Sequence, residues 1–172
     1  MYLRYKRIPA ILAVLALLAM ASIACSFSTV DLRSGSAQLD IRMNESEINT
    51  LLENSNNHIE DDDVLLDSIS RVELHDGFVR VFGPYRTADR SRATGSYDVT
   101  FRSEQGELQA EITGVDMDGV SLSDARIQNL NKEMATSLAR SARQSKGEVE
   151  FKQVRITDGD FSMQVIVHWN DR

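Results

Sequence analysis

Few residues in this chain have the chemistry for nucleophilic or acid–base catalysis: one cysteine, Cys25, and three histidines, His58, His75 and His168. A hydrolase pairs an activated Ser or Cys with a base, usually His. The sequence contains no G-x-S-x-G, H-E-x-x-H, P-loop or G-x-G-x-x-G pattern. His75 and His168 fall in alternating segments and are read as surface strand residues. The sequence therefore predicts a non-catalytic protein without metal or cofactor. The alternative is an enzyme whose turnover is lost when His75 or His168 is replaced by Ala.

The cysteine follows directly on a segment that is typical of export signals. Residues 1–7 carry three basic side chains and no acid, and Ile8 to Ala24 is uncharged and strongly apolar. A charged start followed by an apolar stretch is the pattern of a signal peptide. Cleavage after Ala21 or Ala24 is one outcome, and an uncleaved anchor helix over Ile8 to Phe27 is another, because about 20 apolar residues span a bilayer.

The four residues Ser22-Ile23-Ala24-Cys25 resemble the lipobox of bacterial lipoproteins. This resemblance implies that Cys25 is diacylated and becomes the new N-terminus. It also implies a cell-envelope protein that is lipid-anchored to the outer face of a bacterial membrane. The membrane, reached through the N-terminal lipid, is then its first partner.

Composition limits the remaining possibilities. The 172 residues are 42% hydrophobic, with 19 basic and 26 acidic side chains. Without the three basic residues of 1–24, the chain has 16 basic and 26 acidic residues and a net charge of -10. Such an acidic chain argues against nucleic acid as the main partner, and one cysteine excludes an internal disulfide. We divide the chain into a signal peptide at 1–24, a polar tether at 25–36, and a single α+β domain at 37–172.

Apolar periodicity predicts the elements of that domain. A strand is expected over 37–43 and a short helix over 44–54, where Asn44 and Glu47 have the spacing of a capping box. A second hairpin is expected over 97–112 and a long helix from Ser121 or Ser123 to Ser145. The acidic run at 60–63 lacks the ligand spacing of a calcium loop and is interpreted as solvated loop, with a weak cation site as the alternative.

The strongest internal signal is a repeat at a constant offset of 82 residues. Alternating apolar residues around Asp76-Gly77, over 69–81, match those around Asp158-Gly159, over 151–163. Asp-Gly between alternating segments favours a type I′ hairpin. Each copy follows an expected helix, so the domain is expected to consist of two helix-hairpin halves. The fold class is α+β: an antiparallel sheet of about seven strands packed on one long and one short helix.

Two groups of residues are candidates for binding. The segment 83–92 holds Arg86, Arg90 and Arg92 with one acid, Asp89, and could contact anionic headgroups, with a solvated loop as the alternative. The long helix carries an apolar stripe that could line a ligand groove, with ordinary core as the alternative. The stripe consists of Ile127, Leu130, Met134 and Leu138.

The order of these segments, from Glu45-Ser46-Glu47 through Val72-x-Leu74-x-Asp76-Gly77 to Val154-x-Ile156-x-Asp158-Gly159, resembles the LmeA-like and YceB-like lipoproteins of the tubular lipid-binding (TULIP) type. The resemblance covers about residues 37–169. It implies a curved sheet around a long helix with an apolar groove for an acyl chain.

Two functions are therefore expected from different classes. The first is a membrane-anchored lipoprotein that binds phospholipid, fatty acid or another apolar ligand between the long helix and the sheet. The second is an envelope structural or protein-interaction lipoprotein without a small ligand.

Overall fold

The computed structural model describes residues 25–31, 35–54, 65–144 and 148–168. The signal peptide, the acidic run at 60–63 and His58 lie outside the described residues. The fold is α+β, as predicted, and all its strand pairs are antiparallel. The described elements are β1 (Cys25–Asp31), β2 (Ser36–Asn44), α2 (Glu45–Glu53), β3 (Arg71–His75), β4 (Phe78–Arg86), β5 (Arg92–Glu104), β6 (Glu107–Asp116), α3 (Ala125–Gln144), β7 (Glu148–Thr157) and β8 (Asp160–His168).

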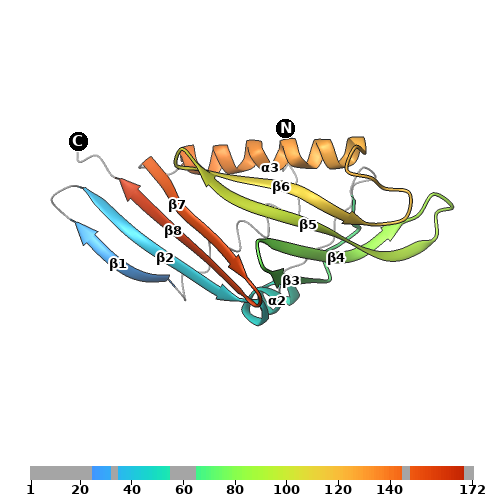
Figure 1. Ribbon diagram of the computed structural model, residues 1–172, viewed down its shortest axis with the longest axis horizontal. Helices are drawn as coiled ribbons and strands as arrows, with labels where there is room; N and C mark the ends of the chain where they lie inside the picture. The colour runs from blue at the N-terminus through green and yellow to red at the C-terminus, as the bar shows by residue number, and fades with distance from the viewer. Residues whose placement is uncertain (1–24, 32–34, 55–64, 145–147, 169–172) are drawn as a thin grey trace, which may run out of the picture.

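The strands form two sheets instead of the single sheet that we expected. The terminal sheet has the order β1-β2-β8-β7, and the central sheet has the order β3-β4-β5-β6. In Figure 1 the two sheets extend in opposite directions from a common middle, and α3 lies along β6. Alternation predicted β2 to β8, but it does not say which hairpins share a sheet.

The segment expected to be a tether contributes an eighth strand. β1 pairs with β2 from Cys25 opposite Ile41 to Asp31 opposite Ser36, with an irregularity between Phe27 and Thr29. Strand pairing is made by the backbone, so the polar composition of this segment did not reveal it. Within the described residues, strand structure is therefore already present at Cys25–Asp31, a segment that we expected to be a polar tether.

The predicted capping box starts α2. The side chain of Asn44 accepts a hydrogen bond from the Glu47 amide at 2.9 Å, and the Glu47 carboxylate accepts one from the Asn44 amide at 2.8 Å. The longer helix α3 begins at Ala125, later than expected, because Asp124 accepts from the Arg126 amide at 2.9 Å. The hydroxyls of Ser121 and Ser123 bond each other instead.

Both helices cover edges of the central sheet. On β3, the Asn49 side chain accepts from the Val72 amide at 2.8 Å and donates to the Val72 carbonyl at 2.9 Å. On β6, the Asn131 side chain accepts from the Ile112 amide at 2.9 Å. Asn49 and Asn131 are 82 residues apart, which is the offset of the hairpin repeat. Covered edges do not present unpaired backbone groups to another chain.

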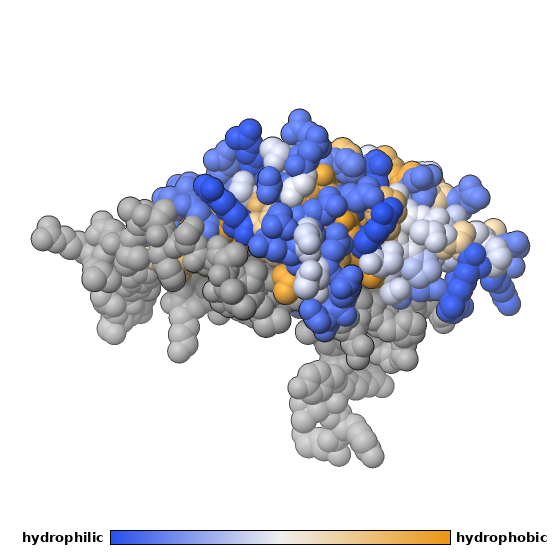
Figure 2. Space-filling view, turned by 90° about the horizontal axis from the view of Figure 1, so that it is seen from below, coloured by the Kyte–Doolittle hydropathy of each residue, from blue (hydrophilic) through white to orange (hydrophobic). Residues whose placement is uncertain are grey.

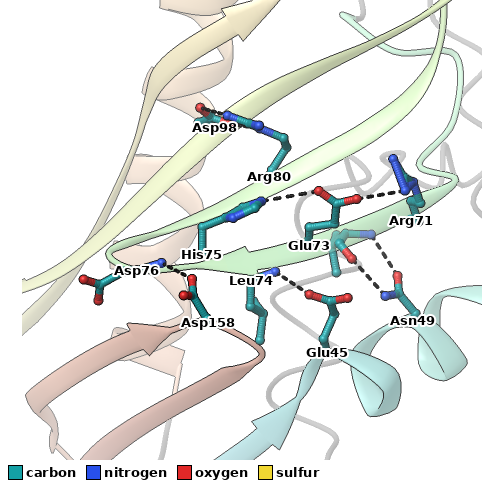
Figure 3. Close-up of polar contacts among 11 residues, drawn as sticks. Glu45, Asn49, Arg71, Glu73, Leu74, His75, Asp76, Arg80, Asp98 and Asp158 are labelled. Atoms are coloured by element: carbon teal, nitrogen blue, oxygen red, sulfur yellow. Dashed lines mark hydrogen bonds and ion pairs between the residues drawn. The ribbon is translucent and has the colours of Figure 1, made fainter.

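The two repeated turns meet in space. The Gly77 amide donates to the Ile156 carbonyl and the Gly159 amide donates to the Leu74 carbonyl, both at 3.1 Å. These bonds are reciprocal at the repeat offset, and the Asp76 amide adds a bond to the Asp158 carboxylate at 3.1 Å (Figure 3). A type I′ turn needs positive φ at both central residues. Gly77 and Gly159 have positive φ, but Asp76 and Asp158 do not, so neither Asp-Gly turn is the type I′ turn that we expected. Among the described turns, Gln105-Gly106 has that pattern.

Candidate ligand-binding surfaces

The apolar stripe of α3 belongs to the core in this structure. Ile127 is fully buried, Met134 is 2% exposed, and Leu138 is buried as well. Leu130 is half-buried and packs against the same core. The structure therefore brings the four predicted residues together on one face, but the surface that they offer a ligand is mainly that of Leu130.

A second apolar surface lies where the two sheets meet, and we call it the apolar strip. Its members are half-buried side chains that pack against the core from β5, β7 and β8: Phe101, Val149, Phe151, Val154 and Val167. Phe101 of the central sheet contacts Phe161 of the terminal sheet edge-to-face, with ring centroids 6.3 Å apart. Seen from below, hydrophobic residues reach the surface between hydrophilic ones in the middle of the molecule (Figure 2).

The joint between the sheets is not an ordinary strand pair. β7 packs against β5, but the two belong to different sheets. Near one end of the joint, the Phe151 amide donates to the Gly106 carbonyl at 2.8 Å, and the Ser103 hydroxyl donates to the Phe151 carbonyl. At the other end are the reciprocal bonds of the Asp-Gly turns. A bulge in β7 between Phe151 and Gln153 lies inside the apolar strip.

The three predicted arginines lie on the β4–β5 connection. Arg86 and Arg92 are directly opposite each other on the two strands, and all three side chains are exposed. Asp67 was missed as their partner: its carboxylate lies 4.0 Å from Arg86 Nε and 3.7 Å from Arg92 Nε. Asp67 follows the buried pair Leu65 and Leu66, and this adjacency to a core segment was the available signal.

The histidines lie in polar contacts on strand surfaces. His75 Nε2 is 3.3 Å from the Glu73 carboxylate, and the His75 ring stacks on Phe78 at 4.9 Å. Glu73 also accepts a hydrogen bond from Arg71 at 2.9 Å (Figure 3). His168 Nε2 lies 3.8 Å from Glu150.

A further ion pair lies on the same outer face of the central sheet. Arg80 contacts Asp98 through two hydrogen bonds of 2.7 and 3.0 Å (Figure 3). The hydrogen bond to Asp98 raises the pKa of Arg80, and burial opposes that shift. Such bidentate pairs fix geometry between neighbouring strands.

Comparisons with known proteins give no relatives: no protein family, no curated protein and no solved structure matches this chain. In the part of the chain that the structure describes, no helix is both long and apolar enough to cross a membrane. Within those same residues, no three His, Cys, Asp or Glu side chains are grouped to hold a metal ion.

Proposed function

We propose that this protein is a membrane-anchored extracytoplasmic lipoprotein that binds the acyl chain of a lipid along the apolar strip, without catalysis. The anchor is inferred from the lipobox-like sequence ending at Cys25. The observation that carries the binding proposal is the apolar strip itself, which is half-buried at a joint between two sheets. The ligand would lie along the inner faces of β5, β7 and β8 and not on the α3 stripe, where Ile127 and Met134 are buried in the core.

The joint is suited to an extended apolar ligand for an energetic reason. Burying a methylene group contributes about 0.8 kcal/mol, so an acyl chain gains affinity with each carbon that it places against the strip. Displacing one sheet relative to the other breaks no strand ladder, but it breaks the hydrogen bonds at Phe151 and at the turns and exposes part of the core that both sheets share. An anchored protein would also remain beside its source of lipid.

Ligand binding can be tested with one residue of the apolar strip. Phe151→Asp places a carboxylate in the strip, and Phe82→Asp is the matched control because Phe82 is a half-buried phenylalanine that lies under Arg71 in the central sheet. Native mass spectrometry of the purified full chain should show lipid bound to the unmodified protein and to Phe82→Asp. A fluorescent fatty acid should bind both and be displaced by palmitate, whereas Phe151→Asp should bind neither lipid nor probe.

Two outcomes would count against acyl-chain binding: an unmodified protein without lipid or probe, or equal binding by the two variants. Thermal melts show whether each variant is folded.

The anchor has its own test, because labelled palmitate should be incorporated into the unmodified chain and not into Cys25→Ser. An unlabelled but exported chain would support cleavage without lipidation.

A second function, a structural or protein-interaction lipoprotein of the envelope, is favoured by the continuous core. Ile127, Met134 and Leu138 all belong to one buried cluster that includes residues from both sheets. This alternative predicts a folded, palmitate-labelled protein that binds no lipid and that crosslinks to a partner in the envelope.

A further inference from the structure

The β4–β5 connection presents an unusual arrangement of positive charge, and we call residues 86–92 the arginine hairpin. Arg86 and Arg92 face each other across the two strands, and their side chains are 64% and 72% exposed. Like charges directly opposite in a sheet repel each other. A folded chain retains such a pair at little cost where a counter-ion can approach it.

Within the described residues, Asp67 is the carboxylate that pairs with both arginines. It contacts each of them on the Nε side, at 4.0 Å for Arg86 and 3.7 Å for Arg92. Both contacts are longer than normal hydrogen bonds, and the Oδ2 oxygen of Asp67 is buried without a hydrogen bond. Asp67 therefore neutralises one charge at most, and the ion pairs of both arginines with the described residues lie on the Nε side of each guanidinium.

The acid inside the hairpin is used by the turn. The Asp89 carboxylate accepts hydrogen bonds from the Thr87 hydroxyl and from the Ser91 amide at 3.0 Å. These bonds lower the pKa of Asp89 to about 2. They also fix the turn in which Arg90 adopts a positive φ of 66°. The Asp89 carboxylate is thus engaged by Thr87 and Ser91, and no ion pair between it and the three arginines is present among the described residues.

An exposed apolar side chain lies at the same end of the molecule. Leu122 is 42% exposed, which makes it the one exposed large hydrophobic side chain among the described residues. Its loop is tied to the base of the arginine hairpin, because the Asp118 amide donates to the Tyr85 hydroxyl at 2.8 Å. Figure 1 shows the hairpin and the β6–α3 loop side by side at this end. Asp116 ends β6 opposite Ser96 of β5, and Asp118 follows it, so both acids lie near the base of the hairpin and not at its tip.

We propose that the arginine hairpin, together with Leu122, docks on anionic phospholipid headgroups at the surface of the membrane that holds the protein. This inference rests on the proposed anchor at Cys25. Arginine matches phosphate oxygens with two parallel hydrogen bonds. A leucine beside basic residues fits the boundary between headgroups and acyl chains. Docking would hold the apolar strip in a fixed orientation relative to the lipid that it binds.

The docking can be measured on the full chain in lipid nanodiscs by hydrogen exchange. One set of discs contains phosphatidylcholine alone, and the other contains phosphatidylglycerol as well. The peptide that covers residues 84–94 should exchange more slowly in the anionic discs, and 1 M salt should abolish the difference because it shortens the screening length to about 3 Å. Arg86→Gln combined with Arg92→Gln should lower the ratio of docked to free protein by about 30-fold.

The matched control removes the same charge elsewhere. Arg42→Gln combined with Arg155→Gln changes two exposed arginines that flank Ser162 on the outer face of the terminal sheet. This control should exchange like the unmodified chain in both kinds of disc. Equal exchange of the hairpin in neutral and anionic discs would overturn the proposal, and so would an equal effect of the control pair.

A small phosphate ligand is separated from a membrane by adding glycerol 1-phosphate to neutral discs. Full protection of the hairpin by this anion would replace the membrane by a soluble ligand and refute docking. Failure of the proposed function gives results that differ from failed docking of the hairpin. A chain that leaves the discs lacks the anchor, whereas a chain that stays docked but carries no lipid in native mass spectra lacks acyl-chain binding only.

Discussion

The contact between α2 and the edge of β3 allows a sharp test of the fold. Asn49 makes two hydrogen bonds to the backbone of Val72, one as acceptor at 2.8 Å and one as donor at 2.9 Å. Each net hydrogen bond contributes about 0.5–1.5 kcal/mol, and a partly buried group that loses its partner adds to the loss. Asn49→Ala should therefore lower the free energy of unfolding by about 2–3 kcal/mol, which corresponds to a midpoint roughly 4–12 °C lower.

Two further variants give the expected order. Asn131→Ala removes one bond, to the Ile112 amide, and should cost about 1–2 kcal/mol. Thr50→Ala is the control on α2, because the Thr50 hydroxyl bonds only the Ser46 carbonyl within its own helix, and it should stay within about 0.5 kcal/mol. Urea unfolding followed by circular dichroism measures all three. If Asn49→Ala were no more costly than Thr50→Ala, the edge contact would not stabilise the sheet and our account of the covered edge would be wrong.

Three more predictions concern the core, a turn and a close approach. Met134→Trp should lower stability in urea by about 1–3 kcal/mol through overpacking, because Met134 is 2% exposed, and the same change at half-buried Leu130 should cost less. The pKa of Asp89 lies below its unfolded value, so its bonds stabilise the turn above about pH 4 and are lost as pH falls toward 2, which NMR titration of the carboxylate should show. Gly83→Ala should unfold at markedly lower urea, because a Cβ there would lie 2.0 Å from the Ser68 carbonyl oxygen, and an unchanged midpoint would contradict this packing.

The sequence was a good guide wherever a local rule decides the structure. Alternating apolar residues predicted β2 to β8, and the Asn44 and Glu47 spacing predicted the start of α2. The repeat predicted two similar hairpins. The reciprocal bonds of Gly77 and Gly159 show that the turns of the two hairpins make equivalent contacts with each other. In each case the signal comes from neighbouring residues along the chain.

Long-range pairing could not be predicted in the same way. β1 is held by its ladder to β2, and a ladder uses backbone groups that every residue has. Asp67 lies near both Arg86 and Arg92 because the pairing of β4 with β5 places these two arginines opposite each other. The α3 stripe illustrates the same limit, since an apolar face has the same spacing whether it faces a core or a ligand.

The split into two sheets follows from what covers β6. Its outer edge is taken by α3, where Asn131 bonds the Ile112 amide, so β7 cannot extend the central sheet there. β7 pairs with β8 instead, and the two sheets meet through side chains such as Phe101, whose ring contacts Phe161, and through the few hydrogen bonds at Phe151. A contact made by side chains can open without the loss of a ladder, whereas a contact made by a ladder opens only with several backbone bonds broken. The joint between the two sheets is therefore lined by half-buried apolar side chains, and this is the physical reason for proposing an acyl chain there and not beneath α3, where Ile127 and Met134 are buried.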